Sequence, residues 1–227
     1  MVTAIVLAAG RSTRMGGGRN KQFIELLGKP LVYYSLAAFE RCCVVDAIVL
    51  VRRPDYAEQA ERIPRDFGFK KVVAFSDGGV ERQNSVWNGM ERCDRATEIV
   101  TVHDGARPLV TPALIEATVT SARSFGTGIA ATKIVDTIKE ANADKTVIRT
   151  IDRTKLWAMQ TPQTVQFALL RKAYARVFDK NLVVTDEAAA VELLGHRVDL
   201  VDTPFLNLKI TAPSDLAIAE ALLRQRV

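Results

Sequence analysis

The sequence contains few of the residues from which disulfide frameworks, zinc sites and nucleophilic triads are built. Its 227 residues include three cysteines and two histidines. Cys42, Cys43 and Cys93 are odd in number and lack CxxC spacing, which argues against a disulfide framework or a zinc site and predicts reduced, mostly buried thiols. His103 is far in sequence from His196, so we expect a packed, hydrogen-bonded side chain there and no metal cluster. The absence of GxSxG disfavours a nucleophile-based hydrolase.

Long apolar runs and blocks of one charge are also missing. No run reaches membrane-spanning length, and a strand begins almost at once without a charged segment before it, so we expect a cytoplasmic protein with no signal peptide and no membrane partner. The 31 basic and 26 acidic residues give a net charge of +5. This excess is not gathered in a Lys/Arg block, so it favours a small polyanionic ligand and no nucleic acid.

The most informative stretch runs from Thr3 to Phe23. An apolar strand over Ala4–Leu7 leads into a loop with four glycines and four cations, Arg11, Arg14, Arg19 and Lys21. Small residues let the backbone approach a ligand, and cations offset phosphate charge, so this loop is typical of a phosphate site. Neither a Walker loop nor GxGxxG is present. The alternative interpretation is a basic surface loop after an edge strand.

The chain repeats this arrangement twice more. Expected strands at Lys70–Phe75 and Ile99–Val102 also end in glycine-containing polar loops, SDGG and HDGARP, before a helix. Such alternation predicts an α/β, Rossmann-like fold of one domain over residues 1–227, with a mostly parallel sheet and helices on both faces. Because parallel sheets bind ligands at the carboxyl ends of their strands, we expect the three loops to lie along one edge.

The remaining elements follow from periodicity and capping signals. We expect further helices at 31–41, 54–63 (ended by Pro64), 112–125, 168–178, 188–194 (capped by Thr185) and from Pro213 onward. Further strands are expected at 44–51, 156–166, 198–201 and 206–210.

After Gly128 the sequence pattern changes from strand–loop–helix units to two alternating strand patterns around a turn, which predicts a β-hairpin arm at about 134–154. Residues 129–139 alternate in strand fashion, 142–145 form a turn signal, and 147–151 return as a strand. Because a two-stranded arm is marginally stable alone, we expect it to pack on something, such as a second subunit.

Several charged residues could carry chemistry, each with an ordinary structural alternative. Asp104 could hold Mg²⁺ or could simply stabilise a turn. Arg107 and Arg153 could each bind a phosphate through two parallel N–H donors, or each could form a surface ion pair. Lys209 would need an anionic partner if it faced inward.

Taken together, the motifs resemble those of a known family. LAAGRSTRM followed by KQF, then GGVERQNSV, VHDGARP, DRTKLWAMQTPQ, TDEA and NLKITAPSDL occur in the order and approximate spacing of 2-C-methyl-D-erythritol 4-phosphate cytidylyltransferases, which act in the non-mevalonate isoprenoid pathway. The resemblance covers nearly the whole chain. Three departures are Ser12 for a usual Gly, Asn20 for a usual Pro, and TPFL before Asn207. The first two bear on the backbone path of the opening loop.

The resemblance implies a role for each matching position. The nucleotide CTP would be surrounded by Ala8, Ala9, Gly10, Gly79 and Ser85, with Arg82 supporting the same loop. The triphosphate would be held by Arg14 and Lys21, with Lys209 reaching the reacting phosphates and Asp104 with Gly105 at the ribose and Mg²⁺. The methylerythritol phosphate would be received by Thr137, Arg153, Thr161 and Thr185, with Arg107 nearby. The arm would form a homodimer and complete the neighbour's site.

The reaction implied needs no protein base. The polyol's own phosphate, already ionised, attacks the α-phosphorus of CTP, and the protein aligns two polyanions and offsets their charge. Alternatives are a cytidylyltransferase for another polyol phosphate such as ribitol 5-phosphate, a regulatory module that binds CTP without turnover, and, third, a nucleic-acid-binding protein.

Overall fold

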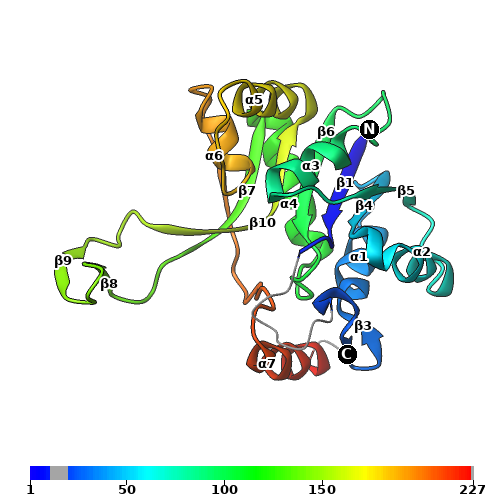
Figure 1. The fold of residues 1–227 in the computed structure, drawn as a ribbon, viewed down its shortest axis with the longest axis horizontal. Helices are drawn as coiled ribbons and strands as arrows, with labels where there is room; N and C mark the ends of the chain where they lie inside the picture. The colour runs from blue at the N-terminus through cyan, green and yellow to red at the C-terminus, as the bar shows by residue number, and fades with distance from the viewer. Residues whose placement is uncertain (11–19, 226–227) are drawn as a thin grey trace.

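The centre of the fold is a seven-stranded sheet, seen in a computed structural model that describes residues 1–10 and 20–225. Its strands are β1 (Val2–Leu7), β4 (Ala47–Arg52), β5 (Val72–Asp77), β6 (Ile99–Asp104), β7 (Thr127–Lys133), β10 (Trp157–Gln166) and β11 (Leu200–Asp202). They lie in the order β11-β7-β10-β6-β1-β4-β5 (Figure 1). Only β10 is antiparallel to its neighbours, β6 and β7, so the predicted mostly parallel sheet is confirmed.

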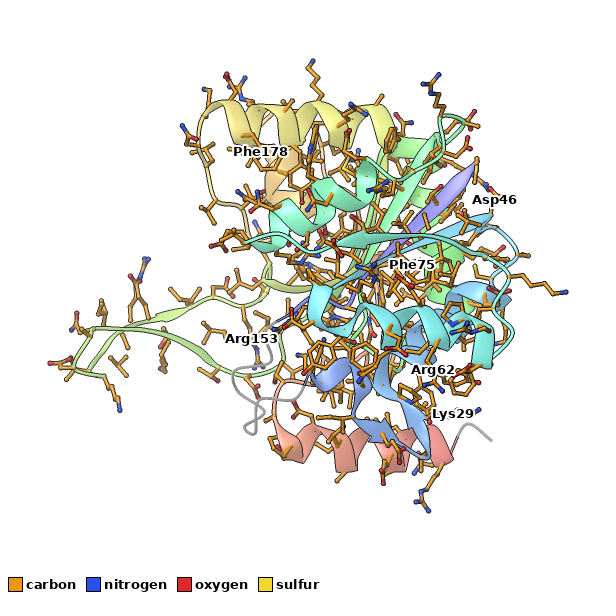
Figure 2. All side chains as sticks on the ribbon, turned by 45° about the vertical axis from the view of Figure 1, so that its right-hand side comes forward. Lys29, Asp46, Arg62, Phe75, Arg153 and Phe178 are labelled. Carbon is orange, nitrogen blue, oxygen red and sulfur yellow. The ribbon has the colours of Figure 1, made fainter. Side chains whose placement is uncertain are left out.

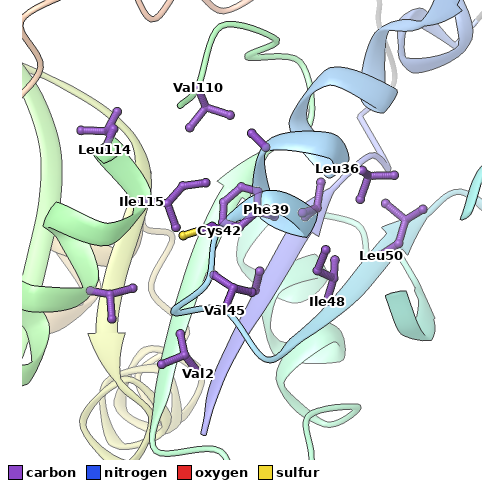
Figure 3. Close-up of a cluster of buried hydrophobic side chains, with 14 of the residues drawn as sticks. Val2, Leu36, Phe39, Cys42, Val45, Ile48, Leu50, Val110, Leu114 and Ile115 are labelled. Atoms are coloured by element: carbon purple, nitrogen blue, oxygen red, sulfur yellow. The ribbon is translucent and has the colours of Figure 1, made fainter. Parts of the chain in front are cut away.

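Helices cover both faces of the sheet. One face packs against α1 (Leu31–Arg41), α2 (Ala57–Asp66) and α4 (Pro112–Phe125), and Figure 3 shows the core there, with Phe39, Ile48 and Ile115 fully buried. The other face packs against α3 (Arg82–Met90), α5 (Phe167–Asp179) and α6 (Glu187–Glu192). Every residue of β1 and of β6 is buried, as expected for strands covered on both sides.

Capping residues set the helix ends where the sequence predicts them most clearly. The hydroxyl of Thr111 accepts a hydrogen bond from the backbone N–H of Leu114, Pro112 opens α4, and Gly126 ends it with φ of 88°. A left-handed residue at that point strongly favours glycine. The predicted helix is therefore confirmed at both ends.

A small layer lies below the sheet in Figure 1, near the C-terminus. It contains the short helix η2 (Lys21–Phe23), the strands β2 (Glu25–Leu26) and β3 (Lys29–Pro30), and α7 (Pro213–Arg224). Its core joins Leu26, Leu31, Ala106, Ile210 and Ala219. Residues from both ends of the chain thus pack on the loop after β6.

The predicted arm is present. Strands β8 (Ile138–Ala141) and β9 (Val147–Ile151) pair antiparallel and project away from the sheet (Figure 1). The strand expected over 129–139 is interrupted, because β7 ends at Lys133 and β8 begins at Ile138. Val135, in the interruption, is 78% exposed. The arm makes its own two-stranded sheet and leaves its side chains largely in solvent.

Two expected helix ends and one expected strand are wrong. The segment expected as a helix over 54–63 begins with the 3-10 turn η3 (Pro54–Tyr56), and α2 follows it. Pro64 does not stop α2, which continues to Asp66. Pro64 is buried in the last turn of the helix, where its missing N–H removes only one hydrogen bond. Thr185 does not cap α6, because the Asp186 carboxylate accepts from Ala189 N–H instead. Residues 206–210 form no strand: they are held by Arg107, which donates to the Asn207 carbonyl, and by Ile210 N–H, which donates to Ala106.

The three cysteines differ in exposure, and this predicts their reactivity. Cys42 is buried and Cys93 is half-buried, but Cys43 is exposed, contrary to the expectation of mostly buried thiols. Burial raises the pKa of Cys42, and it raises the pKa of Cys93 to about 12. The thiolate is the form that reacts with iodoacetamide. At pH 8 we therefore expect rapid modification of one thiol of the native protein, the exposed Cys43, and mass spectrometry measures it. Cys43→Ser should abolish that fast reaction; two fast thiols in the wild type would contradict it.

Candidate active site

A pocket of about 470 Å³ opens at the carboxyl ends of β1, β4, β5 and β6. The three polar loops that follow β1, β5 and β6 contribute to it together, as the alternation of strands and loops predicts. Among the described residues it is lined by Leu7, Ala9, Gly10, Lys21, Gln22, Arg53, Pro54, Gly78, Gly79, Val80, Glu81, Arg82, Ser85, Asp104, Ala106, Lys209 and Thr211.

Asp104, the last residue of β6, lies between two cations in this pocket. Its Oδ2 is 2.6 Å from Lys209 Nζ, and its Oδ1 is 3.3 Å from Arg82 Nε. Burial acts to raise the pKa of Asp104, but Arg82, Lys209 and Arg107 outweigh it and hold that pKa well below the ordinary range. The carboxyl group is therefore ionised at neutral pH. Lys209 lines the pocket, with its side chain 38% exposed, and has the anionic partner expected of a lysine that faces a site.

Lys21 reaches the same pocket from the other end of the chain. It begins η2, where the Asn20 side chain accepts a hydrogen bond from Gln22 N–H and fixes the turn. The Lys21 side chain is 9% exposed, and its Nζ donates to the Ile210 carbonyl at 2.7 Å. Since Lys209 precedes Ile210, the fold brings both lysines into the same part of the pocket. An ammonium group held in a largely buried site can act strongly on a nearby phosphate.

Backbone forms the wall beyond β5. Gly79 N–H donates to Ser85 Oγ at 3.0 Å, which ties the SDGG turn to α3. A Cβ built on Gly78 would lie 2.3 Å from Ala9 Cβ, and one on Gly79 would lie 2.2 Å from Asn84 Cβ. No larger side chain fits at either position without movement of the chain. A planar ligand could therefore approach this wall closely and meet mainly peptide groups.

Arg82 connects the pocket to the α5 and α6 side of the sheet. Its two terminal nitrogens donate to the two oxygens of Glu187, at 2.7 and 3.0 Å. Glu187 has no exposed surface and also accepts from the Tyr174 hydroxyl at 2.9 Å. Desolvation acts to lower the pKa of Arg82, but Glu187 and Asp104 outweigh it and raise that pKa above its usual value. Sequence reasoning missed Glu187, because an acidic residue in the first turn of a helix is usually solvated.

Two residues expected at or near the polyol phosphate, Thr161 and Arg107, are not in the pocket lining but form hydrogen bonds with residues in it or near it. The Thr161 hydroxyl is buried and accepts from Asp104 N–H at 3.0 Å, and it lies 3.1 Å from His103 Nδ1. Arg107 is half-buried and donates to the Asn207 carbonyl at 2.7 Å. Both side chains hold loops in this arrangement. His103 is the packed, hydrogen-bonded residue expected from the sequence, and its burial lowers its pKa to about 3.

Other sequence-predicted residues lie outside the pocket lining. Ala8 and Gly105 are buried next to lining residues, and their N–H groups donate to Val51 and Leu7 carbonyls. Thr137, Arg153 and Thr185 are exposed, and Arg153, labelled in Figure 2 where the arm joins the body, donates to the Val135 carbonyl. Arg14 lies outside the described residues, as do Arg11, Ser12 and Arg19. Gln22, Arg53, Val80 and Thr211 also line the pocket although the sequence analysis gave them no role; all but Arg53 lie within the motifs KQF, GGVERQNSV and NLKITAPSDL, which could have found them.

The donor set fits a hard cation shared with phosphates. No group of three His, Cys, Asp or Glu residues that could hold a metal is found in the described part of the chain. Mg²⁺ usually takes one or two carboxylates, with substrate phosphates and waters as its other ligands. The ionised carboxylate of Asp104, at the wall of the pocket, meets that requirement.

Comparison with known proteins identifies close relatives. The family model described as 2-C-methyl-D-erythritol 4-phosphate cytidylyltransferase (IspD) matches residues 2–225. Proteins of that name from Geobacillus thermodenitrificans (strain NG80-2) and Alkaliphilus metalliredigens (strain QYMF) are 44% and 42% identical, over 99% of this chain and 97% and 94% of theirs.

Solved structures agree with these sequence matches. The 4-diphosphocytidyl-2C-methyl-D-erythritol synthase of Anaerococcus prevotii superposes with a TM-score of 0.86 at 28% identity, over 98% of each chain. The 2-C-methyl-D-erythritol 4-phosphate cytidylyltransferase of Thermus thermophilus gives 0.81 at 30% identity, over 97% of this chain and 98% of that one. In the described residues, no helix is long and apolar enough to span a membrane.

Proposed function

The chain belongs to the 2-C-methyl-D-erythritol 4-phosphate cytidylyltransferase family, and we propose that its reaction takes place in the pocket lined by Lys21, Asp104 and Lys209. The enzyme transfers the cytidylyl group of CTP to 2-C-methyl-D-erythritol 4-phosphate. The products are pyrophosphate and 4-diphosphocytidyl-2-C-methyl-D-erythritol, an isoprenoid precursor. The location rests on one observation: two lysines that line the pocket and an ionised carboxylate lie together beside a glycine-rich wall.

Different parts of the pocket suit different parts of CTP. The cytidine would lie against Ala9, Gly10, Gly79 and Ser85, where peptide groups are accessible, with Ala8 behind them. A wall of fixed peptide donors and acceptors favours one base, because a wrong base leaves buried polar groups unpaired. The triphosphate would extend toward Lys21 and Lys209, with Arg14 from the opening loop, and the ribose would lie near Asp104 and Gly105.

Charge, not proton transfer, is what the site supplies. The attacking oxygen belongs to a phosphate that is already ionised near neutral pH, so no protein base is needed, and the buried His103 is held neutral. Lys21 and Lys209 would bind the phosphates and offset the charge on the leaving pyrophosphate. Asp104 would hold Mg²⁺, which, when bound, neutralises phosphate charge. For this, Lys209 must exchange its contact with Asp104 for one with phosphate.

The polyol phosphate would be bound from the arm side of the molecule. Thr137, just before β8, and Arg153, just after β9, both lie at the base of the arm, and Thr185 lies just before α6; all three are exposed. In one chain they are outside the pocket lining, which supports the proposal that a second chain completes each site. Val135, Val147 and Ile148 are 78%, 61% and 52% exposed, an unusual amount of apolar surface for a short arm. We assign this surface to a homodimer contact.

Charging the arm is expected to separate the two subunits. The double variant Val147→Asp/Ile148→Asp should have the mass of one 25.0 kDa chain by light scattering, whereas the wild type should have twice that mass. Burying two carboxylates in an apolar contact is strongly unfavourable, and turnover should fall together with the mass. Val73→Asp, which charges the 64%-exposed Val73 on the edge strand β5, is the matched control. A monomeric wild type at assay concentration with full activity would rule out the dimer.

A pyrophosphate-release assay tests the function directly. CTP with 2-C-methyl-D-erythritol 4-phosphate should release pyrophosphate, and CTP with ribitol 5-phosphate should release far less. Release only with ribitol 5-phosphate would assign the other polyol. Binding of CTP without release with either acceptor would make the protein a regulatory module.

A further inference from the structure

A fully buried carboxylate, Glu187, lies behind the pocket and does not line it. It is the first residue of α6 and has no exposed surface. Three donors converge on it: both terminal nitrogens of Arg82, at 2.7 and 3.0 Å, and the Tyr174 hydroxyl, at 2.9 Å. Replacement of a buried ion pair by apolar groups is often neutral or stabilising, so fold stability alone does not account for this arrangement.

The contacts of Glu187 fix the orientation of Arg82. A guanidinium group is planar and its five N–H donors point in set directions. With Nη1 and Nη2 both on Glu187, the donor that faces Asp104 is Nε, which lies 3.3 Å from Asp104 Oδ1. Arg82 therefore offers Asp104 a single, rather long hydrogen bond. Arg82 leaves Asp104 Oδ2, which bonds Lys209 Nζ at 2.6 Å, open to an exchange of Lys209 for another cation.

The position of Glu187 is set in turn by β10. The Gln163 side-chain oxygen accepts from the N–H groups of Glu187 and Ala188, both at 3.0 Å, and its nitrogen donates to Asp186 Oδ2 at 3.0 Å. Gln163 is 1% exposed. The arm leads directly into β10. The Glu187 carboxylate, which orients Arg82, is therefore positioned by a strand whose first residues lie on the side of the site proposed for the polyol phosphate.

We propose that Glu187 is a positioning residue for the transfer reaction: it neutralises and orients Arg82, so that Arg82 does not form a closed ion pair with Asp104. Without the charge of Glu187, the guanidinium would turn toward Asp104 and engage both its oxygens. Asp104 would then be less available to a cation, while the uncompensated Arg82 would still attract the phosphates of CTP. Turnover would fall and CTP binding would persist.

Glu187→Gln tests this proposal, which rests on the proposed function. The variant keeps the shape of the side chain and removes its charge; Glu192→Gln, at the exposed end of the same helix, is the control. We expect a kcat about tenfold to hundredfold lower for Glu187→Gln, as when a group that orients a ligand residue is lost. The KM for CTP should stay within about threefold of that of the control. A kcat equal to that of Glu192→Gln would overturn the proposal.

A double-mutant cycle separates positioning from general destabilisation. If Glu187 acts through Arg82, then Arg82→Gln/Glu187→Gln should match Arg82→Gln in kcat within about twofold. A kcat of the double variant more than about twofold below that of Arg82→Gln would overturn the proposal. The comparison also decides the matter if the single Glu187→Gln variant does not fold, because the double variant contains no unpaired guanidinium. Wild-type and Glu192→Gln turnover report separately on the reaction itself.

Discussion

Replacement of Lys21 by alanine is expected to lower kcat by about two to three orders of magnitude, the usual effect of removing one preorganised charge from a transition state. The Lys21 ammonium group is held in the pocket wall by the Ile210 carbonyl, and Lys21 as a whole is 9% exposed, so its charge acts where water screens it little. Charge develops on the leaving pyrophosphate during the reaction, and a fixed cation stabilises that state more than it stabilises bound CTP. The kcat should therefore fall by a larger factor than the KM for CTP rises.

Steady-state pyrophosphate release over a range of CTP concentrations measures both constants. Lys180→Ala, at an exposed position after α5, is the matched control and should behave as the wild type. Lys21→Met retains most of the side-chain volume, and equal loss in Lys21→Met and Lys21→Ala would assign the effect to charge. Near-normal turnover of Lys21→Ala would show that Lys21 is not catalytic.

Replacement of Asp104 by asparagine is expected to have an effect of similar size, about two to three orders of magnitude in kcat. The two side chains have the same shape, so the change removes the negative charge that Lys209 and Arg82 both contact. Binding of CTP should not weaken much, since the pocket becomes more positive. The loss should appear in kcat and in the Mg²⁺ concentration needed for half-maximal turnover.

A Mg²⁺ titration of the wild type and of Asp104→Asn checks this second point. The control is Asp202→Asn, an exposed carboxylate at the end of β11, which should leave the titration unchanged. The pH dependence gives an independent check. Because the pKa of Asp104 is held well below its ordinary range, wild-type kcat should not fall through protonation of Asp104 between pH 7 and pH 5. If Asp104→Asn turns over at the wild-type rate and Mg²⁺ dependence, Asp104 does not hold the metal.

Much of the architecture is predictable because it depends on local patterns. Mostly apolar runs predict strands buried on both faces, and β1 and β6 are buried at every position. Thr111, Pro112 and Gly126 mark both ends of α4. The three loops around the pocket are also predictable, because parallel strands end at the same edge of their sheet.

The contacts that shape the site are harder to predict because they join distant residues. Arg82 and Glu187 are 105 positions apart, as are Asp104 and Lys209, and no local pattern records such pairs. Residues 206–210 show a similar limit. They have the composition of a strand, but long-range contacts hold them instead: Arg107 donates to the Asn207 carbonyl, and the Asn207 side-chain nitrogen donates to the Thr161 backbone carbonyl. Position in the fold, not residue type, decides these cases.

The antiparallel direction of β10 has a consequence for how such an enzyme can vary. Trp157, at the start of β10, pairs with Lys133, at the end of β7, so the two strands form one hairpin and residues 134–156 are an insertion in its turn. Surface insertions of this kind change length and sequence without altering the register of the strands that carry them. The hairpin turn also opens at the edge where β6 ends in Asp104. Under the roles proposed above for the arm, exchange of this one insertion would change acceptor choice and subunit pairing together, while the nucleotide half of the site would stay unchanged.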